Sequence, residues 1–204
     1  MKFISGIVAT LKRVISPDDF FVDTPEGKTL ILKNSAYQDI NFGINPRNTG
    51  LGRPTLEEFV SRIQQFSFAV GDFADLSPEE MLHGWEEGSE LEFHTHVGIK
   101  NSDIDDRGVR FELTYAYIDS NGIYQATAVE HEVLIEANLS TPTDLYFSFN
   151  KFTPGHGKIG NQVLTCIKRI SAENNPEPTS NPFLLSIGLH YKINTFGSRT
   201  IRYK

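Results

Sequence analysis

The feature that most constrains the fold is a two-residue alternation of apolar and polar side chains, which recurs in several segments. Successive side chains of a β-strand point to opposite faces of its sheet, so this alternation marks a strand with one buried face. The apolar rows are Leu91, Phe93, Val97 and Ile99; Phe111, Leu113, Tyr115 and Tyr117; and Phe183, Leu185, Ile187, Leu189, Tyr191 and Ile193. Each row predicts an extended segment whose apolar side chains face a core.

Turn residues divide the chain from Thr55 onward into segments of strand length. Strands are expected at 62–70, 90–100, 109–118, 123–135, 144–150, 161–170 and 182–193. Between the third and fourth, Asn121-Gly122 favours a tight type I′ hairpin. The 15 Phe and 7 Tyr suit strands, where aromatic rings pack well on a pleated surface. The pattern predicts an all-β fold: two antiparallel sheets packed as a β-sandwich or jelly roll.

The first quarter of the chain has a different character. Residues 1–15 carry apolar side chains at roughly helical spacing, and Pro and Gly punctuate residues 16–54 around one strand at 29–32. The sequence therefore predicts an extended N-terminal arm over 1–54, with a short helix, loops and one hairpin. The β-sandwich domain is expected over 55–204.

Charge and cysteine content exclude several classes of partner. The net charge of -7 argues against nucleic acid, which needs a basic surface to neutralise phosphates. No apolar run approaches the ~20 residues needed to cross a bilayer, so no membrane association is expected. Cys166 is the single cysteine and cannot form an internal disulfide, which favours synthesis in a cytoplasm.

His94-Thr95-His96 is the pattern with the clearest chemical potential. Two histidines two residues apart on a strand share one face and could ligate one metal ion, with His190 as a third ligand if its strand is a neighbour. With Gly88 the motif resembles the first half of the cupin metal motif, although Lys100 and Asn101 stand where a cupin has its glutamate. A cupin-like metal-binding enzyme, a dioxygenase or isomerase, is thus one hypothesis. The other is a polar strand face on which His and Glu pair and bind nothing.

Other catalytic signatures are absent from the sequence. It has no G-x-S-x-G, no phosphate-binding G-x4-G-K-[ST] and no H-E-x-x-H. The acidic residues near the histidines, Glu90 and Glu92 among them, are typical of a solvated face. We therefore expect no catalytic residues, no cofactor and no enzymatic activity.

Several segments resemble a recurring pattern in phage and prophage virion-associated proteins. They are Leu-His-Gly-Trp-Glu-Glu-Gly-Ser-Glu-Leu-Glu-Phe-His-Thr-His at 82–96, Val-Arg-Phe-Glu-Leu-Thr-Tyr at 109–115, Gly-Leu-His-Tyr at 188–191, and Thr-Phe-Gly-Ser-Arg at 195–199 followed by Lys204. The family's order is Leu-x-His, then Gly-Thr, then a strand ending in His-x-His. This chain departs from it in lacking a proline beside His83 and in having Val97 where the family has tryptophan.

The resemblance implies a bacteriophage virion structural protein: a head decoration or cement protein, or a tail or neck component. It implies a homo-oligomer, with a trimer preferred, which is made in the host cytoplasm and contacts capsid, portal or tail proteins in the virion. The side chains expected at the interface are Trp85, Glu90, Glu92, His94, His96 and His190. A carbohydrate-binding module is a third hypothesis, but most of the aromatic residues alternate onto the apolar faces and leave few rings to stack on sugars.

Overall fold

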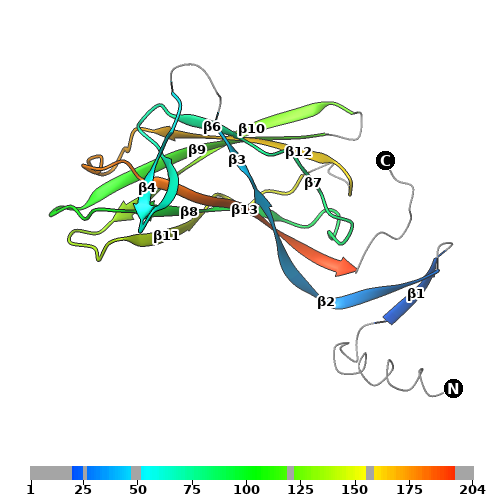
Figure 1. Cartoon of the computed structure of the whole chain (residues 1–204). Coiled ribbons are helices and arrows are strands. Elements are labelled where there is room, and N and C mark those ends of the chain that lie inside the picture. Colours follow the sequence, from blue (N-terminus) through cyan, green and yellow to red (C-terminus); the bar gives the residue numbers. More distant parts are fainter. Residues whose placement is uncertain (1–19, 25–26, 47–51, 119–121, 155–158, 196–204) are drawn as a thin grey trace.

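The computed structural model describes residues 20–24, 27–46, 52–118, 122–154 and 159–195 (Figure 1). These residues form strands packed as two antiparallel sheets and contain no helix, which confirms the predicted all-β sandwich. The short helix expected at 1–15 lies outside the described residues. Within the described ranges, no helix is long and apolar enough to cross a membrane.

The first sheet has seven strands built around the C-terminal strand β13. Its members are β1 (Phe20–Thr24), β2 (Gly27–Phe42), β4 (Thr55–Val60), β5 (Ile63–Ser67), β8 (Leu91–Ile99), β11 (Thr143–Ser148) and β13 (Phe183–Thr195). Strand β13 pairs with β8 along one edge and with β5 and β2 in succession along the other. Three segments far apart in the sequence therefore lie side by side in the order β2, β13, β8.

The second sheet has six strands in the order β10-β9-β12-β6-β3, with β7 also paired to β12. Its members are β3 (Ile44–Asn45), β6 (Phe73–Leu76), β7 (Glu79–Glu80), β9 (Arg107–Ile118), β10 (Tyr124–Ile135) and β12 (Gln162–Ile170). Strands β9 and β10 form the predicted hairpin, and Gly122 has a φ of 78°. The predicted two-residue turn needs correction, because Ile118 pairs with Tyr124 and this register leaves an odd number of residues between the strands. All seven predicted strands are present, as β5 and β8 to β13.

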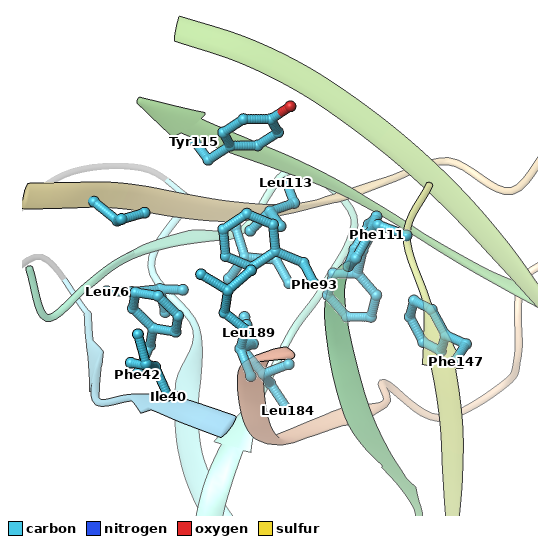
Figure 2. Packing of buried hydrophobic residues seen from close by; sticks show 14 of the residues in the cluster. Ile40, Phe42, Leu76, Phe93, Phe111, Leu113, Tyr115, Phe147, Leu184 and Leu189 are labelled. Atoms are coloured by element: carbon cyan, nitrogen blue, oxygen red, sulfur yellow. The ribbon is translucent and has the colours of Figure 1, made fainter. Parts of the chain in front are cut away.

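The core lies between the two sheets and is rich in aromatic rings (Figure 2). Phe93 of β8 is 1% exposed, and its ring centroid lies 5.8 Å from that of Phe42 in β2 and 5.3 Å from that of Tyr115 in β9. The predicted apolar rows of β8 and β9 face this core. Their polar neighbours are thereby directed to the outer faces of the sandwich.

The predicted apolar row of β13 needs one correction. The pairing of β13 with β8 shifts register between Leu184 and Ser186, so the alternation changes phase there. Leu184 is fully buried, whereas Leu185 is half-buried and approaches Gly98. From Ile187 onward the predicted row is buried as expected.

The prediction that residues 1–54 lie outside the sandwich also needs correction. Strand β2 pairs with β13 from Ala36 to Phe42, and Ile40 and Phe42 are buried in the core. The hairpin expected around residues 29–32 is present as β1 and the start of β2, which lie away from the body of the sandwich (Figure 1). Among the described residues, those from about Ala36 onward thus belong to the sandwich, and the β1–β2 hairpin projects from it.

Candidate functional site

The outer face of the first sheet gathers the histidines singled out in the sequence. His94 and His96 lie on β8, and His190 lies on the neighbouring strand β13. His190 lies opposite Glu92 of β8 on one side and opposite Asp39 of β2 on the other. The sheet order therefore brings Asp39, His190 and His94 together from three strands.

Asp39, His94 and His190 form one compact cluster. The Nε2 of His190 lies 2.9 Å from the Oδ1 of Asp39, and the His94 and His190 rings stack with centroids 4.1 Å apart and planes 25° apart. One ligand atom from each residue falls within 4.8 Å of the other two. We refer to these three residues as the Asp39 cluster.

His94 is the most deeply placed member of the cluster. The residue is 5% exposed, and its Nδ1 is buried without a hydrogen-bond partner among the described residues. Burial, and to a smaller extent the neighbouring His190, lowers the pKa of His94. At neutral pH the His94 imidazole is therefore uncharged.

Gly188 makes room for the His94 ring. It lies opposite His94 in the register of β13 and β8. A Cβ atom at position 188 would lie 2.6 Å from the Nε2 of His94 and closer still to Cε1, well inside van der Waals contact. Glycine at this position leaves the space that the His94 imidazole occupies beside His190.

Replacing Gly188 with alanine should displace the His94 ring and destabilise the protein. Overpacking of this kind costs ~1–3 kcal/mol of unfolding free energy, which urea unfolding measures directly. The same substitution in a His94→Ala background should cost less, because the ring that the new methyl group strikes is gone. Equal costs in the two backgrounds would show that the clash lies elsewhere.

His96 points to the same face but belongs to a separate pair. Its Nδ1 lies 2.6 Å from the Oδ2 of Asp144 on β11, and its ring packs edge-on against Tyr146 at 5.3 Å. The centroids of His94 and His96 are 5.9 Å apart, with planes 79° apart. The predicted ligand set of His94, His96 and His190 is therefore not assembled, because Asp39 and not His96 lies beside the other two.

The predicted interface residues differ in how exposed their side chains are. Trp85 is 1% exposed, so its side chain belongs to the core and cannot form a contact surface. Glu90 is exposed and Glu92 is half-buried, with its carboxylate 3.8 Å from Lys151. His96 and His190 keep about a third of their side-chain surface, 35% and 30%. Of the predicted interface residues, Glu90, Glu92, His96 and His190 thus keep side-chain surface in contact with solvent.

Comparisons with known proteins leave the chain without a family. No family model matches it, and no curated protein matches it. A solved structure from Clostridium thermocellum, the CBM22-1–GH10 modules of endo-1,4-beta-D-xylanase 10B complexed with xylohexaose, is 12% identical with a TM-score of 0.34. That match covers 85% of this chain and 28% of the xylanase chain. A TM-score of 0.34 reflects remote structural similarity, and the match gives no information about what this chain binds.

Proposed function

We propose that this chain is a structural component of a bacteriophage virion, assembling as a homo-oligomer and docking on another structural protein of the particle. The observation that carries the proposal is the β1–β2 hairpin, which projects from the sandwich (Figure 1). A strand at the edge of a sheet offers unpaired N–H and C=O groups to another chain. Among the described strands, β1 pairs only with β2.

The segments that resemble phage virion proteins support the same proposal. Residues 91–96 form most of β8, residues 109–115 lie in β9, and residues 188–191 lie in β13. Gly188 and His190 pair with His94 and Glu92, so two of these segments build one surface on the first sheet. By analogy with those phage proteins, the expected oligomer is a trimer.

Removal of residues 1–24 should test the role of the hairpin without disturbing the core. This truncation deletes β1 and keeps β2, whereas removing all of 1–54 would also take the buried Ile40 and Phe42. Sedimentation should show an oligomer for the full chain and a lower mass for the truncated chain, with little change in the midpoint of thermal unfolding. An oligomer of unchanged mass after the truncation would overturn the role of β1.

A second experiment tests the virion itself. Phage particles purified from the host that encodes the chain, and analysed by quantitative mass spectrometry, should contain it at a fixed number of copies per particle. Its absence from such particles would overturn the virion role, whatever its oligomeric state in solution.

A further inference from the structure

We propose that Asp39, His94 and His190 bind a divalent first-row transition-metal ion such as Zn²⁺ on the outer face of the first sheet. Two imidazoles and one carboxylate are nitrogen and oxygen ligands that suit such ions. This site is independent of the proposed role in assembly, because a single chain supplies all three ligands.

The positions of the ligand atoms carry the proposal. Ligand atoms around a tetrahedral Zn²⁺, each ~2.0–2.2 Å from the ion, are separated by about 3.4 Å. In the Asp39 cluster they lie within 4.8 Å of one another, and the carboxylate oxygen and the His190 Nε2 are 2.9 Å apart. To bind an ion, the contact between the His190 Nε2 and the Asp39 carboxylate must open, and the stacked rings of His94 and His190 must rotate to aim a nitrogen of each at the ion.

His94 supplies a second and independent observation. Its imidazole is nearly fully buried, yet the Nδ1 has no hydrogen-bond partner within the described part of the chain. Buried polar atoms are normally satisfied, so an unpaired one needs a reason. Rotation of this ring toward an ion would give His94 a polar partner that the surrounding side chains do not provide.

The side of the site formed by Asp39 and His190, away from the buried His94, is open to solvent. The side chains of Asp39 and His190 are 43% and 30% exposed, so an ion can enter from that side. With three protein ligands, the fourth position of a tetrahedral ion faces outward, where water can occupy it. A bound ion would also join β2, β13 and β8, fastening the strand that carries the projecting hairpin to the centre of the sheet.

Titration of the metal-free full-length protein with zinc chloride tests the site. After dialysis against a chelator, calorimetry should show one Zn²⁺ bound per chain, and the bound ion should raise the midpoint of thermal unfolding. Cobalt chloride should give visible absorption bands of a nitrogen- and oxygen-ligated ion.

Matched variants on the same face locate the ion. His190→Gln and Asp39→Asn should each weaken zinc binding by about tenfold or more, since each removes one of three ligands. His96→Gln should leave the affinity unchanged, because His96 pairs with Asp144 outside the cluster. Absence of zinc binding by the parent protein, or an equal loss for His96→Gln and His190→Gln, would overturn the assignment.

Discussion

Trp85→Ala is expected to lower the free energy of unfolding by ~3–5 kcal/mol, the range for truncating a large buried aromatic side chain. The indole is 1% exposed, and its Nε1 donates a 3.0 Å hydrogen bond to the hydroxyl of Ser89. The backbone of Trp85 also bridges to Ile193 at the end of β13. A loss of this size can remove half of the stability of a typical domain. Urea unfolding followed by circular dichroism measures it.

Two smaller changes separate the contributions of the indole. Trp85→Phe keeps most of the apolar volume and should cost less than Trp85→Ala. Ser89→Ala removes only the hydrogen-bond acceptor and should cost ~1 kcal/mol. If Trp85→Ala lowered the free energy of unfolding no more than Ser89→Ala does, packing of the indole would not stabilise the core. Trp85 would then again be a candidate interface residue.

Strand alternation was sufficient to predict β8 to β13, because it reflects burial of one side of each strand, but it did not identify the full length of β2. It failed where pairing changes locally. A register shift in β13 places Leu184 in the core in place of Leu185, and the sequence carries no separate signal for such a shift. The strands β6 and β7 have four and two residues, too few for a periodic signal.

The histidines of the candidate site were predicted from the sequence, but Asp39 was not. Pro and Gly on either side of residues 36–42 favoured an arm, although Asp39 alternates with Ile40 and Phe42 at strand spacing. That alternation is the signal that could have located β2. The pairing of β2 with β13 is a long-range contact, so the neighbourhood of Asp39 and His190 follows from the sheet order and not from local sequence.

Glu177→Ala should destabilise the protein by about 3 kcal/mol, because it removes the carboxylate that pairs with a buried guanidinium. Arg169 is 1% exposed, and its Nη2 donates to Glu177 while its Nη1 donates to the carbonyl of Phe68. Burial lowers the pKa of Arg169, and Glu177 opposes that effect. The other oxygen of Glu177 accepts a 2.6 Å hydrogen bond from the amide of Ala172, so this carboxylate also anchors the loop before β13.

Arg169→Met should cost less than Glu177→Ala, although Arg169 is the more buried partner. Methionine fills the buried volume without a charge, and Glu177, whose side chain is 36% exposed, can be hydrated once the guanidinium is gone. Glu173→Ala in the same loop is the matched control: Glu173 pairs with Arg110 at the surface with 67% of its side chain exposed, and its loss should cost ~0–1 kcal/mol. Urea unfolding of the three variants gives the ranking. A larger loss for Arg169→Met than for Glu177→Ala would contradict this prediction. It would mean that the hydrogen bonds of the guanidinium to Phe68 and Asn181 stabilise this region more than its ion pair with Glu177 does.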